Sequence, residues 1–241
     1  MIGLGTAINA AGILIGGVAG LLVGKGLTKR FQDTLMSAMG ICILFISIAG
    51  VLKEVFVITG DQISTQGTFM MIVSMVAGAL TGELIDIERR TVQFGEWLKK
   101  KTNNKKDTQF VDGFVLGSLT VCVGAMAVIG AIKDGISGDY SILLTKAILD
   151  AVIILVMTAS YGKGCIFSVI PVVLFQGSVT VLARLMLPIM TVQALSNLSL
   201  VGSILIFCVG INLTFGKKIK VANLLPSIVF AVLWALIPWL E

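Results

Sequence analysis

The chain has 241 residues, of which 56% are hydrophobic and only 13% are charged, and its mean hydropathy is +1.02. Soluble domains average about 25% charged residues, so the composition excludes a soluble protein and predicts one integral membrane domain over residues 1–241. The net charge of +5 does not indicate a nucleic-acid partner, because the loops distribute it by topology. The lipid bilayer is the partner that this composition requires.

Residue types that carry most enzyme chemistry are missing or scattered. The chain has no histidine, and its four cysteines lie in or beside apolar segments without a C-x-x-C spacing. We therefore expect no metal site, no disulfide framework and no cofactor. The motifs H-E-x-x-H and G-x-S-x-G are also absent, so an enzyme is not expected.

Apolar segments of spanning length recur along the sequence, which predicts an all-α, polytopic transmembrane helix bundle. We count about eight spans, or seven if one segment does not cross. The sixth contains Pro171 and the triplet Gln176-Gly177-Ser178, a combination that allows a broken or re-entrant helix, although a plain proline kink is the more common result. The predicted spans are residues 2–24, 35–52, 67–87, 112–132, 141–160, 164–186, 197–215 and 221–240.

Basic residues lie mainly in alternate connections between these spans. Fourteen of the eighteen lysines and arginines follow odd-numbered spans. Positive charge is retained on the cytoplasmic side of membrane proteins, so we expect basic loops inside and both termini outside. The longest basic connection, residues 88–110, has an apolar stripe that includes Phe94 and Leu98. It is predicted to be an amphipathic segment on the inner membrane surface, followed by a linker.

Glycines recur at every fourth position in the first and third predicted spans, and Gly113 and Gly117 repeat the spacing in the fourth. This spacing places a row of small residues on one helical face and lets another helix backbone approach closely. The rows predict helix packing and also allow a homo-oligomer. Their members are Gly12, Gly16 and Gly20 in the first span and Gly78 and Gly82 in the third.

The fifth span carries opposite charges four residues apart, Lys146 and Asp150. That spacing places both on one helical face, and Asp150 falls near the bilayer midplane. An ionisable side chain there costs roughly 2.5–3.5 kcal/mol on insertion scales. We favour a charged lining of a substrate or ion pathway, and the alternative is a structural ion pair. Asp139, just before this span, is interpreted as a helix cap.

Four further polar residues occur within otherwise apolar spans. Both Glu83 and Asp86 can be read as solvated charges at the end of the third span; Asp86 is expected to be one, whereas Glu83, beside Gly82, is the better candidate for a buried group. We regard these residues, with the charged pair, as candidates for the lining of a pathway: Asn9, Glu83, Gln176 and Asn212.

Several motifs in a fixed order resemble the bacterial membrane proteins of the domain of unknown function 554 family. The resemblance covers essentially the whole chain and implies a bacterial multi-pass plasma-membrane protein that is often described as a transporter. It carries no catalytic residues. The motifs are Gly5-Thr6-Ala7-Ile8-Asn9, Gly82-Glu83-Leu84, Cys122-Val123-Gly124-Ala125-Met126, Gly138-Asp139 through Lys146 and Asp150, Phe175-Gln176-Gly177-Ser178 and Asn223-Leu224-Leu225-Pro226.

Two functions remain open from the sequence. The first is a transporter or channel for an unidentified ion or small polar solute, which would pass along the intramembrane polar residues. The second is a membrane accessory, sensor or scaffold protein whose buried polar residues are structural. An accessible cavity beside Asp150 would favour the first.

Overall fold

The computed structural model describes residues 2–59, 62–104, 107–122 and 124–237. Helices make up most of this part of the chain, and one antiparallel hairpin pairs Phe56 with Thr65. The elements are α1 (Leu4–Gly24), α2 (Lys29–Val55), β1 (Phe56–Thr59), β2 (Gln62–Thr65), α3 (Thr68–Ile85), α4 (Ile87–Lys101), α5 (Phe110–Cys122), α6 (Ala125–Ser137), α7 (Ser141–Tyr161), the 3-10 helix η1 (Gly162–Ser168), α8 (Val169–Val181), α9 (Ala183–Met186), α10 (Val192–Phe215), α11 (Val221–Leu224) and α12 (Pro226–Trp234).

The fold is all-α and polytopic. Among the described residues, five helical runs are long and apolar enough to cross a membrane, and the bent pair α5–α6 makes six. The end of the last predicted span, residues 238–240, lies outside the described residues. Large apolar side chains are exposed on the outer faces of the helices, for example Phe45 at 70% and Ile46 at 65%. Such faces suit lipid rather than water.

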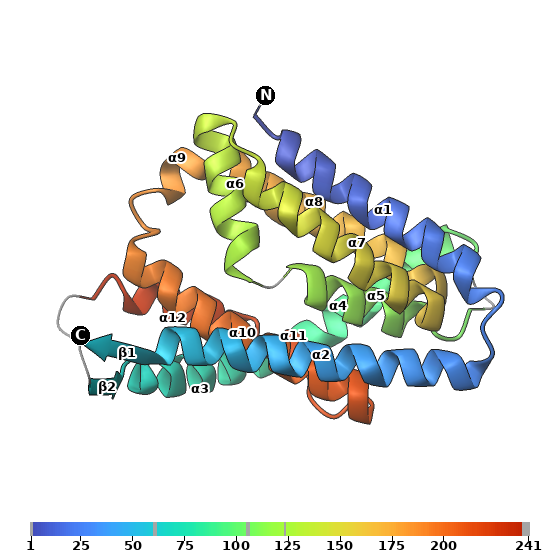
Figure 1. Cartoon of the computed structure of the whole chain (residues 1–241), viewed down its shortest axis with the longest axis horizontal. Coiled ribbons are helices and arrows are strands. Elements are labelled where there is room, and N and C mark those ends of the chain that lie inside the picture. The colour runs from blue at the N-terminus through green and yellow to red at the C-terminus, as the bar shows by residue number, and fades with distance from the viewer. Residues whose placement is uncertain (1, 60–61, 105–106, 123, 238–241) are drawn as a thin grey trace.

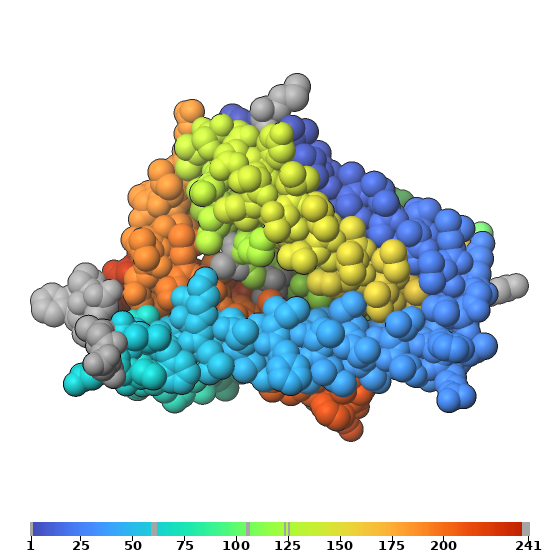
Figure 2. Space-filling view, in the orientation of Figure 1, coloured from blue at the N-terminus to red at the C-terminus, as the bar shows by residue number. Residues whose placement is uncertain are grey.

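The helices form two groups (Figure 1). One contains α1, α6, α7 and α8, and the other contains α2, α3, α10 and α12, with α5 packed against α7 and η1. Figure 2 shows a recess in the surface where α2 diverges from α6 and α7.

Helices α1 and α7 are parallel and packed closely, because α1 presents a glycine at each contact. A Cβ atom at Gly16 would overlap the backbone of Ala151, so only glycine permits this approach. The other contacts have the same fourfold spacing: Gly12 on Ala147, Gly20 on Leu155 and Gly24 on Ala159. On α3, Gly78 and Gly82 lie in the same way against Ser227 and Asn223.

Helix α8 returns antiparallel to α7 after the turn at η1. Helix α8 is also antiparallel to α1, because Gln176 contacts Asn9 while Thr180, further along α8, contacts Thr6, which comes earlier in α1. The predicted interruption at Pro171 and Gln176 is wrong, because α8 is continuous from Val169 to Val181. Pro171 lies in the first turn of α8, where a missing N–H costs no helical hydrogen bond.

The broken helix is instead the predicted fourth span. The axes of α5 and α6 differ by 62°. Gly124, which precedes α6, has a φ of 138°, a backbone conformation that favours glycine. The break therefore lies between α5 and α6, beside the middle of α7.

The predicted amphipathic segment forms helix α4. Its Leu98 is buried, and Gly95 packs on Phe114 and Val111 of α5. Phe94 contacts Phe114 at a ring-centroid distance of 5.8 Å. The apolar stripe of α4 thus covers the first turns of α5.

The two ends of the bundle differ in the connections that form them. We call "basic end" the end formed by the connections at residues 25–28, 86–109, 162–168 and 216–220, and "hairpin end" the opposite one. At the hairpin end, the N-cap of α7 is Tyr140, which has no side-chain capping bond, and the preceding Asp139 accepts a hydrogen bond at Oδ1 from the backbone N–H of Ser141 at 3.0 Å. Bonding to Ser141 lowers the pKa of the Asp139 carboxyl from its ordinary value of 3.8.

Candidate functional site

The centre of the bundle holds an ion pair within α7. Lys146 Nζ lies 2.8 Å from Asp150 Oδ1 and 2.7 Å from Oδ2. The two residues are buried, at 7% and 3% exposed. Asp150 is nine residues beyond Ser141, which is about 14 Å at 1.5 Å per residue, close to half of a ~30 Å hydrocarbon core. The pair therefore lies near the middle of the membrane-spanning region.

The same ammonium group reaches the break between α5 and α6. Lys146 Nζ donates a hydrogen bond to the carbonyl oxygen of Val121 at 2.8 Å. Val121 belongs to the last turn of α5, whose carbonyls have no intrahelical partner and carry the negative end of the helix dipole. Lys146 thus satisfies a backbone group that the break has freed.

A pair of amides lies beside the ions. Asn9 Nδ2 of α1 donates to Gln176 Oε1 of α8 at 3.2 Å, and both residues are fully buried. Asn9 also lies near the Asp150 carboxylate. The cluster of Asn9, Lys146, Asp150 and Gln176 therefore joins α1, α7 and α8, and Val121 joins it to α5. We call these four residues the central polar cluster.

Polar contacts continue from the central polar cluster to the hairpin end. The hydroxyls of Thr6 and Thr180 are 3.4 Å apart. Next to them, the backbone N–H of Gly5 donates to Asp134 Oδ2 at 3.1 Å, and Asp134 is fully buried. This carboxylate was not singled out from the sequence, because it lies in a short turn segment with Lys133.

Several buried polar atoms of this helix group have no hydrogen-bond partner within the described residues. Asp134 Oδ1 lies at the level of Gly5 and Thr158 lies beside Gly20. Fifteen residues of α1 separate these levels, which is about 22 Å of a ~30 Å core. Buried polar groups normally find a partner, so the atoms mark a polar file along α1, α7 and α8. They are Asn9 Oδ1, Asp134 Oδ1, Thr158 Oγ1, Ser168 Oγ and Gln176 Nε2.

Three cavities open at the basic end, with volumes of about 160, 480 and 560 Å³. Tyr161, the last residue of α7, lines all three. Thr158 lines the largest. In the smallest, Leu119 lines the wall two residues before Val121. The polar file therefore ends at a cavity on the basic side.

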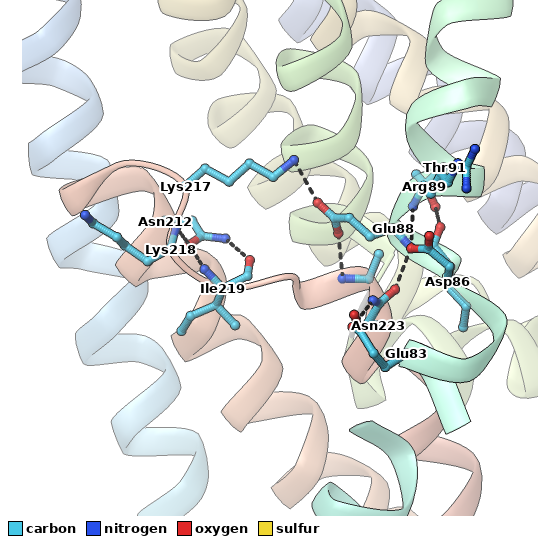
Figure 3. Close-up of polar contacts among 12 residues, drawn as sticks. Glu83, Asp86, Glu88, Arg89, Thr91, Asn212, Lys217, Lys218, Ile219 and Asn223 are labelled. Carbon is cyan, nitrogen blue, oxygen red and sulfur yellow. Dashed lines mark hydrogen bonds and ion pairs between the residues drawn. The ribbon is translucent and has the colours of Figure 1, made fainter. Parts of the chain in front are cut away.

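A second polar network lies at the basic end, where the turn between α3 and α4 meets α11 (Figure 3). Asn223 Oδ1 accepts from the backbone N–H of Glu88 at 2.6 Å, and its Nδ2 donates to Glu83 Oε2 at 2.6 Å. Lys217 Nζ lies 2.9 Å from Glu88 Oε1, and Lys220 Nζ lies 2.6 Å from Glu83 Oε1. The bond to Glu83 raises the pKa of Lys220 above its ordinary value of 10.5.

The family model for "Protein of unknown function (DUF554)" matches residues 4–236. The chain belongs to the DUF554 family. One protein similar to this chain is the "Uncharacterized membrane protein YdfK" of Bacillus subtilis (strain 168), 29% identical over 93% of this chain and 92% of that protein. Another is the "Uncharacterized protein YqgA" of Escherichia coli (strain K12), 28% identical over 95% of this chain and 94% of that protein. No solved structure matches the chain.

The structure brings together four of the six residues that the sequence singled out in this DUF554 chain. Asn9, Lys146, Asp150 and Gln176 form the central polar cluster. Glu83 and Asn212 lie apart from it at the basic end. The expectation that Glu83 is buried is wrong, because its side chain is 59% exposed. Asn212 closes the turn after α10 by accepting from the backbone N–H groups of Lys218 and Ile219 at 2.9 Å each.

Glu88 is the buried carboxylate of that region, and sequence reasoning missed it. It is 7% exposed and Oε2 accepts from the backbone N–H of Ala222 at 3.3 Å. Its position results from Asp86, which has a φ of 54° and ends α3, so that Glu88 enters the first turn of α4. In the sequence, the run of charged residues from Glu83 to Arg90 gives no indication that the chain changes direction at Asp86.

Proposed function

We propose that this DUF554 protein transports a small solute or ion across the membrane along α1, α7 and α8. The observation that supports the proposal most is the central polar cluster, which puts two charges and two amides near mid-membrane beside a broken helix. Ionisable groups at this depth are costly and usually mark a substrate or ion path.

The break between α5 and α6 adds to this support. Each half-helix directs one terminus toward the middle of the bundle, the C-terminus of α5 and the N-terminus of α6. Broken helices whose ends meet near the midplane coordinate substrates and ions in many secondary transporters. Here the freed carbonyl of Val121 already holds the Lys146 ammonium group at 2.8 Å.

We propose eight crossings for the bundle. The helical run Ser141–Val181 contains 41 residues; as one straight helix it would be about 60 Å long, twice a ~30 Å core. Since α7 and α8 are antiparallel, we count them as two crossings. The pairs α5–α6 and α11–α12 each run from the basic end to the hairpin end, and we count each as one.

We further propose that the basic end faces the cytoplasm of a bacterial plasma membrane and that both termini lie outside. The four basic connections meet at one end of the bundle, as the positive-inside rule requires. The three cavities at the basic end would then form the cytoplasmic mouth of the pathway.

One fully buried isoleucine separates the central polar cluster from this mouth. Lys146, Asp150, Ile154 and Thr158 recur at every fourth residue on one face of α7, and Ile154 is 0% exposed. Its Cδ1 lies 3.6 Å from where a Cβ of Gly117 on α5 would be. Ile154 is thus positioned as an apolar plug, and the pathway is closed in this conformation.

Replacing the plug tests the proposal without knowledge of the substrate. Ile154→Ser should raise the ion and proton permeability of vesicles that contain the purified protein, because a hydroxyl would connect Asp150 with Thr158. Val152→Ser is the matched control, since Val152 is 55% exposed on the outer face of α7. A folded Ile154→Ser protein that leaves vesicles as tight as the control would favour a structural role for the cluster.

A further inference from the structure

The smallest cavity at the basic end has a polar mouth and an apolar interior. Its volume of about 160 Å³ is the space of about five water molecules at ~30 Å³ each. One face of α5 lines it from Asp112, in the first turn, to Leu119, which is about 10 Å further along the helix. The interior is formed by the buried side chains of Val115, Leu119 and Val221. An apolar wall with a few convergent polar groups is typical of a site for a small molecule.

The mouth of this cavity carries charges of both signs. Lys217 Nζ lies 2.9 Å from Glu88 Oε1 (Figure 3). A lysine ammonium group has three N–H donors, so its pairing with one carboxylate leaves capacity for a second. Asp112 lines the same cavity and forms no ion pair within the described residues. The cavity therefore offers a carboxylate without a cationic partner together with an ammonium group that has spare donors.

Resting on the transport function proposed above, we propose that this cavity binds the solute and that the solute is a small aliphatic amino acid in its zwitterionic form. Its ammonium group pairs with Asp112, its carboxylate pairs with Lys217, and its hydrocarbon side chain lies against Val115 and Leu119. An anion of the same size would meet the carboxylates of Glu88 and Asp112. An amine without a carboxylate would meet the Lys217 ammonium group.

The central polar cluster presents the same two charges further along the pathway. Lys146 and Asp150 balance each other, so a solute with no net charge keeps the charge of the mid-membrane region at zero. A simple cation or anion would add an unpaired charge in low dielectric, which is costly. The cavity also extends toward this cluster, because Leu119 lies two residues before Val121, whose carbonyl oxygen accepts from Lys146 Nζ at 2.8 Å.

Three probes that differ only in their charged groups test the ligand. They are racemic 2-aminobutyrate, n-propylamine, which lacks its carboxylate, and butyrate, which lacks its ammonium group. Each is titrated into the purified protein in detergent at pH 7 and constant ionic strength, and thermal unfolding is followed. A ligand that binds only the folded state stabilises it by mass action, so 2-aminobutyrate should raise the Tm in a saturable manner. Propylamine and butyrate should leave the Tm unchanged at the same concentrations.

Charge removal at the mouth tests the two contacts separately. Asp112→Asn should raise the 2-aminobutyrate concentration for half of the stabilisation by about tenfold or more, because a charge-assisted hydrogen bond is lost. Glu96→Gln is the matched control, since Glu96 is an exposed carboxylate of α4 that does not line the cavity. Lys217→Gln should weaken binding in the same way, with the exposed neighbour Lys218→Gln as its control. If Lys217→Gln does not fold, because the buried Glu88 loses its partner, Asp112→Asn decides.

Three results would overturn the amino-acid site: no stabilisation by 2-aminobutyrate, equal stabilisation by propylamine or butyrate, or an unchanged response in Asp112→Asn. The Ile154→Ser vesicles separate this proposal from the transport function. A leak without stabilisation by 2-aminobutyrate would leave the pathway standing and remove this solute. Stabilisation with tight vesicles would leave the binding site standing and count against the pathway.

Discussion

Lys146 on α7 donates a hydrogen bond to the carbonyl oxygen of Val121 in the last turn of α5, at 2.8 Å. This contact joins two features that the sequence presents separately, an ion pair within one helix and a break within another. The helix break would otherwise leave a buried carbonyl without a donor, at a cost of about 1–3 kcal/mol. The ion pair is thus part of the support of the broken helix as well as a candidate for the site.

This double role predicts how charge removal affects stability. Asp150→Leu should destabilise the protein by about 3–5 kcal/mol, because it strands the Lys146 ammonium group in low dielectric. Lys146→Met together with Asp150→Leu should cost much less than the single change, since no charge then remains, although the Val121 carbonyl loses its donor. These differences are measured by denaturant unfolding of four proteins: the wild type, Asp150→Leu, Lys146→Met and the double variant. Equal losses in single and double variants would contradict a coupled pair.

The contact between α1 and α7 predicts a difference between two glycines. Gly16→Ala should destabilise the fold by about 1–3 kcal/mol, because the new methyl group overlaps the Ala151 backbone. Gly177→Ala is the matched control on α8, where a Cβ meets nothing within 4 Å. It should be neutral or should stabilise by up to about 1 kcal/mol through helix propensity. Thermal unfolding in detergent compares them, and equal effects would argue against close packing of α1 on α7.

The proposed topology predicts the compartments of two reporters. A reporter inserted at residue 103, in the basic connection after α4, should be cytoplasmic, and one fused after residue 241 should be external. Reporter pairs that are active only inside or only outside the membrane distinguish these positions. Both reporters on the same side would contradict the odd number of crossings that the proposed topology places between them.

The sequence predicted the class of fold and the centre of the site from composition and spacing. Lys146 and Asp150 lie four residues apart in a helix, so local geometry alone brings them together, and the structure has them within 2.8 Å. Asn9 and Gln176 could be named as buried polar residues, but their contact is between residues 167 positions apart. No local pattern encodes such a pairing.

The break was predicted in the sixth span and occurs in the fourth, because Pro171 was given more weight as a helix breaker than Gly124. Pro171 is harmless in the first turn of α8, whereas Gly124 permits a backbone φ of 138° that other residues rarely adopt. The hairpin of β1 and β2 was not predicted either, since it lies in the polar connection after the second span. The burial of Glu88 was not predicted either. It depends on where α3 ends, at Asp86, and this part of α3 packs against α11, a contact that no local pattern shows.

The most direct measurement combines the plug with the central polar cluster. Vesicles with Ile154→Ser should leak ions or protons, and adding Lys146→Met and Asp150→Leu to the same chain should return the leak to the level of protein-free vesicles. This loss is expected if the leak must pass the charged pair at mid-membrane. A folded triple variant that leaks as much as Ile154→Ser alone would show that ions bypass Lys146 and Asp150, and would contradict a pathway through this cluster.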